Sequence, residues 1–79
     1  MKNEVKPLSE QRAKSRVLVH SFTGGKAVTN RLLVLGFTIG AEVTVLQNFG
    51  TGPIILSVKD SRVALGRGEA KKVMVKVID

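Results

Sequence analysis

The chain has 79 residues, of which 43% are hydrophobic and 24% charged, a composition typical of one small globular domain. Its formal net charge of +7 favours partners with acidic surfaces, nucleic acid among them. The sequence has no cysteine, which excludes thiol catalysis, iron–sulfur clusters and thiolate zinc sites. Its longest apolar run, residues 32–37, is far shorter than the roughly 20 residues of a membrane span, and the polar start predicts no signal peptide. A cytoplasmic protein is therefore expected.

The first part of the chain is expected to begin with a lead-in segment over residues 1–7. In the turn that follows, Leu8 is expected to pack on the core. Residues 14–20 then alternate, with Val17 and Val19 on one face, which is typical of a strand.

A helix is predicted over residues 26–35. Val28, Leu32 and Leu35 recur at the spacing i, i+4, i+7 and form one apolar stripe. Gly36 follows the last periodic residue, and glycine there is a common helix terminator.

Four further strands are expected in the rest of the chain. A glycine-rich loop over residues 49–53 separates the first two, and a tight two-residue connection at Asp60 and Ser61 joins the second to the third. Residues 66–71 have room for one turn of helix of the 3₁₀ type. The predicted strands are residues 42–48, 54–59, 62–65 and 73–78.

The pattern of five short strands and one helix of about ten residues predicts an all-β fold. Exposed edges are a liability for so few strands, and closing the sheet into a barrel removes them. We therefore expect a small, partly open barrel over residues 8–79, with the helix across one end or side.

Catalytic and metal sites are not indicated. His20 is the single imidazole and is followed by Ser21, but neighbours on a strand point to opposite faces and make a poor base and nucleophile. The six carboxylates do not cluster at ligand spacing. A phosphate loop requires Ser or Thr after its lysine, whereas Ala27 follows Lys26. No catalytic residue, metal site or cofactor is predicted.

A binding surface is the remaining possibility. Leu33 is an apolar residue on the otherwise polar face of the predicted helix, beside Lys26 and Asn30, and is a candidate anchor for a partner. Phe49, in the glycine-rich loop, is a second candidate. Singly exposed leucines also occur without any role, so the pattern alone leaves both interpretations open.

Nucleic-acid binding stays open as an alternative, because the chain is basic. It would draw on Arg16, Lys59 and Arg62 and would weaken steeply with salt. Single-strand recognition usually presents aromatic stacking platforms, and the three phenylalanines are predicted in or beside turns. This placement weakens the alternative.

The run from Gly24 to Val43, with Arg-Leu-Leu-Val-Leu-Gly-Phe-Thr-Ile-Gly over residues 31–40, resembles the FeoA domain, ferrous iron transport protein A. The tail is similar too: Arg-Val-Ala-Leu over residues 62–65, Glu-Ala at residues 69 and 70, then Val-Met-Val over residues 73–75. The similarity covers residues 8–77. Gly66 and Gly68 depart from it, since charged or long residues are more usual there.

The resemblance implies an SH3-like barrel and a small cytoplasmic accessory protein of bacterial ferrous iron uptake, not an enzyme. Its implied partner is FeoB, a membrane protein that couples a cytosolic GTP-binding domain to an iron pore. The contact surface is then expected on the helix and its exit, with Leu33 as the apolar anchor. The expected contact residues are Lys26, Asn30, Arg31, Leu33 and Phe37. An open barrel edge could also pair with a second copy of the chain.

Overall fold

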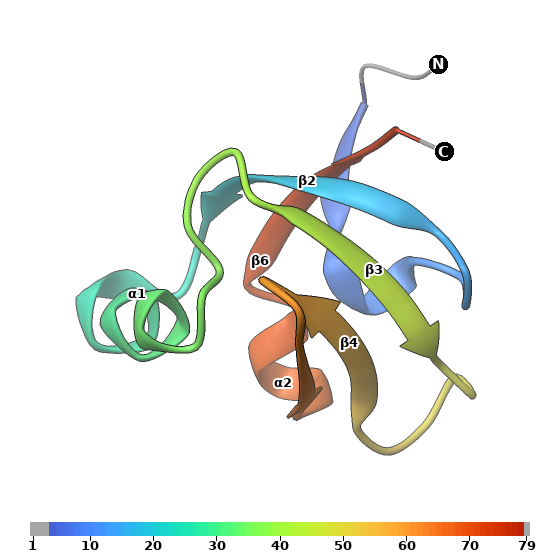
Figure 1. Ribbon diagram of the computed structural model, residues 1–79. Helices are drawn as coiled ribbons and strands as arrows, with labels where there is room; N and C mark the ends of the chain where they lie inside the picture. The colour runs from blue at the N-terminus through green and yellow to red at the C-terminus, as the bar shows by residue number, and fades with distance from the viewer. Residues whose placement is uncertain (1–3, 79) are drawn as a thin grey trace.

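The computed structural model describes residues 4–78, which form six strands, two α-helices and one 3₁₀ turn (Figure 1). In chain order these are β1 (Val5–Pro7), η1 (Leu8–Glu10), β2 (Arg16–Phe22), α1 (Gly25–Val34), β3 (Glu42–Gln47), β4 (Ile54–Val58), β5 (Ser61–Leu65), α2 (Arg67–Ala70) and β6 (Val73–Val77). Residues 1–3 of the expected lead-in and residue 79 lie outside the described part.

The strands form one antiparallel sheet in the order β1-β6-β2-β3-β4-β5, which confirms the all-β prediction. Within residues 4–78 the two outer strands, β1 and β5, do not pair with each other, so the barrel is open between them. Helix α1 lies to one side of the strands, whereas α2 is a single turn between β5 and β6 (Figure 1).

Strand β1 is one strand more than the sequence indicated. Residues 5–7, expected to be lead-in, pair with β6, so that Val5 lies opposite Lys76 and Pro7 opposite Met74. Three residues are too few to show an alternating pattern. Proline is tolerated in β1 because this strand is at the edge of the sheet, where its missing N–H costs no ladder hydrogen bond.

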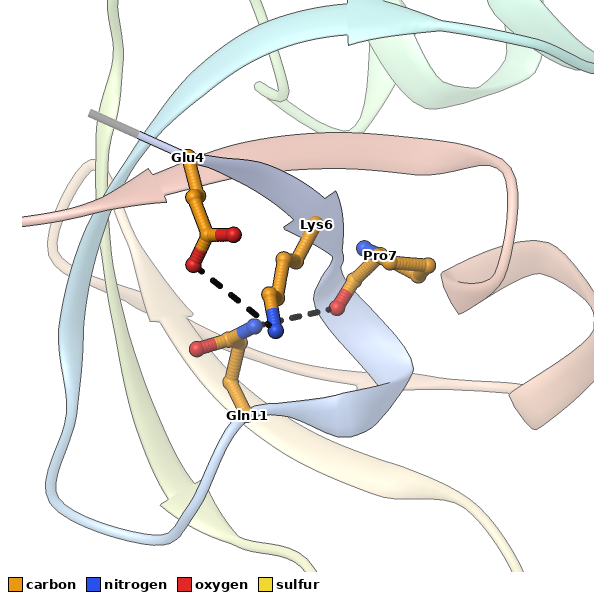
Figure 2. A network of polar contacts seen from close by, with 4 residues as sticks. All are labelled: Glu4, Lys6, Pro7 and Gln11. Carbon is orange, nitrogen blue, oxygen red and sulfur yellow. Dashed lines mark hydrogen bonds and ion pairs between the residues drawn. The ribbon is translucent and has the colours of Figure 1, made fainter. Parts of the chain in front are cut away.

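Figure 2 shows the polar contacts of β1 with the residues around it. The side-chain amide of Gln11, which is 7% exposed, donates from Nε2 to the carbonyl of Pro7 over 3.2 Å. Lys6 Nζ lies 3.9 Å from a carboxylate oxygen of Glu4. The hydrogen bond from Gln11 spans the turn in which Leu8 lies. Leu8 is fully buried, so its predicted packing on the core is confirmed.

The core follows the alternation read from the sequence. Each central strand turns every second residue inward, and aliphatic side chains supply almost all of the buried surface, as expected for a chain with three aromatic residues. The buried apolar residues are Leu8, Val17, Val19, Leu32, Phe37, Val43, Val45, Ile54, Leu56, Val58, Leu65, Ala70, Val73 and Val75.

The hairpin turn between β4 and β5 lies one residue earlier than predicted. Lys59 and Asp60 form it, with φ values of 51° and 64°, and Val58 pairs with Ser61 across it. Two consecutive residues with positive φ are the pattern of a type I′ turn, whose twist matches that of the flanking strands. The turn geometry therefore sets the pairing of β5.

Candidate partner-binding surface

Helix α1 ends in a hydrogen-bonded motif that fixes the direction of the chain after it. Gly36 has a φ of 104°, and its N–H donates to the carbonyl of Leu33 over 3.0 Å. The N–H of Phe37 donates to the carbonyl of Leu32 over 3.0 Å. These two bonds define a Schellman motif, in which the residue after the glycine packs against the residue five positions before it.

The prediction that Phe37 belongs to the contact surface is wrong. Phe37 and Leu32 are both fully buried in the core. The ring of Phe37 therefore does not reach the surface. The left-handed backbone at Gly36 turns the chain back over the helix end, which directs Phe37 inward. Phe37 packs in the core with Leu32 of α1 and is not exposed for contact with a partner.

The other predicted residues on the helix share one exposed face. At 100° per residue, Lys26, Asn30 and Leu33 fall within one sector, on the side away from the buried Leu32. All three are exposed, and Leu33 keeps 40% of its surface in contact with solvent. We call this sector, together with Val34, the helix face.

Val34 was missed by the sequence reasoning, although it is 87% exposed. Residues 32–35 are four consecutive apolar residues, and four successive positions spread around the whole helix, so some of them must face solvent. Ile39, which is 62% exposed, adds an apolar side chain in the loop that follows the helix. The apolar run over residues 32–35 is the sequence signal that predicts an exposed apolar side chain at Val34.

Arg31 lies at the border of the helix face and has a partner within the chain. Its Nε is 2.5 Å from a carboxylate oxygen of Glu69, which links α1 to α2. The Arg31 side chain is 58% exposed, so solvent screens this pair and its contribution to stability is small. Arg31 thus contacts α2 through Glu69 and remains accessible at the edge of the helix face.

A further cation, Lys59, comes close to the helix exit. A Cβ placed on Gly36 would lie 3.7 Å from Lys59 Cδ, which shows that the lysine stem runs beside the glycine. Helix α1 itself carries Lys26 and Arg31 and no carboxylate. Two of these cations, Lys26 and Lys59, are in no ion pair with a described carboxylate, whereas Arg31 is paired with Glu69, so the charge near the helix is positive on balance.

The residues of the nucleic-acid alternative are separated by the structure. Arg16 and Arg62 lie on one outer row of the sheet, whereas Lys59 lies at the exit of α1. Phe49 is 77% exposed at the tip of the β3–β4 loop. Phe22 packs against the core.

His20 is exposed, and its Nδ1 lies 3.0 Å from the hydroxyl of Ser21, so the expectation that these two neighbours point apart is wrong. The pairing of β2 with β6 is irregular between Val19 and Ser21, which disturbs the alternation of side chains there. In the described part of the chain, no three His, Cys, Asp or Glu side chains come together in a way that could hold a metal ion. No helix found there has the length and apolar character needed to cross a membrane.

The fold and the helix surface define a class of protein: a small open-barrel domain of antiparallel strands whose longer helix stands outside the sheet. A model of the FeoA domain family matches residues 6–77. A protein of Methanocaldococcus jannaschii, provisionally named Fe(2+) transport protein A, is 38% identical over 69 residues, which cover 87% of this chain and 83% of that protein. The chain belongs to the FeoA domain family, which is implicated in ferrous iron transport.

Solved structures agree in fold. A crystal structure of an iron uptake regulatory protein, FeoA, is 39% identical and has a TM-score of 0.87, with 95% of this chain and 99% of the other covered. The FeoA of Stenotrophomonas maltophilia, solved in complex with zinc and described as an SH3 domain protein, is 33% identical with a TM-score of 0.77, over 89% of this chain and 88% of that one. The predicted SH3-like fold is confirmed.

Proposed function

We propose that this protein is an accessory module that docks on the cytosolic side of the FeoB-type ferrous iron transporter and modulates it. The observation that carries the proposal is the helix face, where Leu33 and Val34 expose apolar surface beside Lys26 and Asn30. Membership of the FeoA family supports the choice of partner. The S. maltophilia relative has been suggested to act as a ferrous iron transport activating factor, and this suggestion supports a modulating role.

The surface has the composition of an interaction site. Interfaces typically combine a small apolar centre, which supplies most of the affinity, with a polar or charged rim. Leu33 and Val34 form such a centre, Lys26 and Arg31 lie on the same helix, and Lys59 lies near the helix exit. A partner surface with acidic residues around an apolar depression would be complementary, and the charges would mainly raise the association rate.

The test is a titration of the protein against the isolated GTP-binding domain of FeoB, and against the full transporter in lipid nanodiscs. Leu33→Asp places a charge at the apolar centre, and the expected result is a loss of affinity of about ten- to a hundredfold. Val34→Gln should weaken binding as well, and it removes almost no burial because Val34 is 87% exposed. It therefore separates loss of contact from loss of fold.

Ile78→Asp is the matched control, because Ile78 is 42% exposed and lies next to the end of β6, away from α1. It should leave the affinity unchanged. Binding that survives both helix variants, with their folds intact by circular dichroism, would remove the helix face from the interface. Binding to neither form of the transporter would refute the docking role itself.

A further inference from the structure

A second exposed surface lies on the outer face of the sheet, where β3 ends. A hollow of 360 Å³ is lined there by Leu46, Gln47, Ile55 and Arg62. Leu46 is 36% exposed and Ile55 is partly exposed, so two aliphatic side chains meet solvent beside one guanidinium group. The volume is at the lower end of the range of about 300–1,000 Å³ typical of ligand sites, which suits one large side chain better than a whole cofactor.

The strand beside this hollow has free backbone groups. Strand β5 ends the sheet order, and Val58 and Ser61 flank its two-residue turn as a hydrogen-bonded pair. Such pairs alternate along an antiparallel ladder, so the N–H and C=O groups of Arg62 and Ala64 point away from β4. Within residues 4–78, no backbone group of another segment hydrogen-bonds to them. The edge therefore offers two donors and two acceptors to an extended segment.

The side chains along this edge specify what such a segment would carry. Ala64 lies opposite Ile55, and its methyl group is too small to block access to the hollow from the edge of the sheet. A residue on an added strand would be two strand spacings, roughly 10 Å, from Ile55, a distance that a large apolar side chain can largely span. Arg62 follows the same face two positions away and has no ion pair with a described carboxylate. A carboxylate on the added strand would lie beside it.

We propose that β5 binds, as an added strand, an extended acidic segment of a partner protein. In that segment a carboxylate opposite Arg62 stands two residues from a large apolar side chain, which fills the hollow beside Ile55. Charge complementarity supports an acidic occupant, because the chain has a net charge of +7 and Arg16 extends the same outer row across Thr44 and Ser57 to Arg62.

The hollow favours a peptide over a nucleic acid. Its apolar lining is aliphatic, whereas single strands bind by stacking their bases on aromatic side chains. Within the described residues, Phe49 is the one strongly exposed aromatic side chain. One ring is a poor platform for successive bases.

This surface is separate from the helix face. In Figure 1, α1 lies at one side of the molecule and the β3–β4 loop at the other. The hollow lies at the end of β3, whereas the exit of α1 leads into the beginning of β3. The turn before β5 comes close to the helix exit at Lys59, but the pairing of Ala64 with Ile55 lies further along β5, at the hollow. The protein could therefore engage a peptide at β5 while α1 is occupied.

The probe is a displayed library of random nine-residue peptides, selected on the full-length protein at moderate salt. The expected peptides share a carboxylate two positions from a large apolar residue. The best one is then synthesised and titrated. Arg62→Glu should lower its affinity about tenfold or more, through loss of the ion pair and the new repulsion. Ala64→Pro should lower it similarly, because proline removes an outward N–H that the sheet itself does not use.

Lys59→Glu is the matched control, since it makes the same change in net charge within the adjacent turn but lies beside Gly36. It should leave peptide affinity unchanged, and so should Leu33→Asp, which tests the proposed docking through α1 independently. The proposal is overturned if no peptide family is enriched, or if affinity survives both Arg62→Glu and Ala64→Pro. It is also overturned if a ten-nucleotide oligouridylate binds the same residues more tightly than the best peptide.

Discussion

Replacing Gly36 with alanine isolates the energetic role of the turn that ends α1. Gly36 has a φ of 104°, in the left-handed region that residues with a Cβ rarely adopt. A Cβ there would meet Val58 Cγ2 at 3.6 Å and Lys59 Cδ at 3.7 Å, which are ordinary van der Waals distances. The substitution therefore causes no clash, and its cost is the backbone strain alone, about 1–2 kcal/mol.

That cost is large for so small a protein. An unfolding entropy of about 2.1 cal/mol/K per residue corresponds to roughly 0.17 kcal/mol/K for 79 residues, so the Tm should fall by about 6–12 °C. Thermal unfolding followed by circular dichroism gives the shift, and urea titration gives the free energy directly.

Gly68→Ala is the matched control, because Gly68 lies within α2, has no positive φ and has no atom near its Cβ position. Alanine there should stabilise the fold by up to about 1 kcal/mol through its higher helix propensity. An unchanged Tm for Gly36→Ala, or an equal loss for Gly68→Ala, would show that left-handed strain at the helix end does not set the stability.

Two other substitutions test polar contacts of different kinds, both by urea unfolding. Asn48→Ala should cost about 2–3 kcal/mol of unfolding free energy, because its partners would be left unsatisfied. The Asn48 side chain donates to the carbonyls of Ser9 and Gln11 and accepts from Gly50 N–H and Arg67. Thr51→Ala in the same exposed loop should stay within about 0.5 kcal/mol, and equal losses for the two variants would contradict this role of Asn48. Disrupting the exposed ion pair of α1 with Glu69→Gln should cost less than about 1 kcal/mol and nothing at high salt, and a larger, salt-independent loss would show that the pair is structural.

The end of α1 was only partly predicted from the local sequence. Gly36 was correctly predicted as the terminating glycine, and Leu32 as part of the buried stripe. Phe37 was expected at the surface because only its position in a turn was considered. The Schellman motif couples the residue after the glycine to the helix stripe, so the burial of Phe37 follows from the same pattern that identified Gly36.

The helix face was partly predictable for a related reason. The 3.6-residue period correctly placed Leu33 opposite the stripe, together with Lys26 and Asn30. It did not show that Arg31 meets Glu69, because the two residues are 38 positions apart and come together only in the folded chain. Long-range ion pairs leave no periodic signal.

The surface at β5 could not be derived from the sequence. Its hollow depends on which residues of β3, β4 and β5 stand opposite one another, and an irregularity between Val45 and Gln47 shifts that register. The turn at Lys59 and Asp60 lies one residue earlier than predicted, so Val58 pairs with Ser61 where the prediction implied Val63. This shift of two residues keeps each side chain on its face but changes which residues stand opposite one another along β5. Alternation alone predicts strands but not their partners.

The pairing of β1 with β6 brings the two ends of the fold together, with Val5 directly opposite Lys76. In Figure 1 both ends leave the molecule on the side away from α1. A circular permutant that joins these ends by a short linker, or an insertion of the whole domain into a loop of another protein, would therefore retain the sheet. The domain can be carried within a larger chain while α1 and β5 remain accessible.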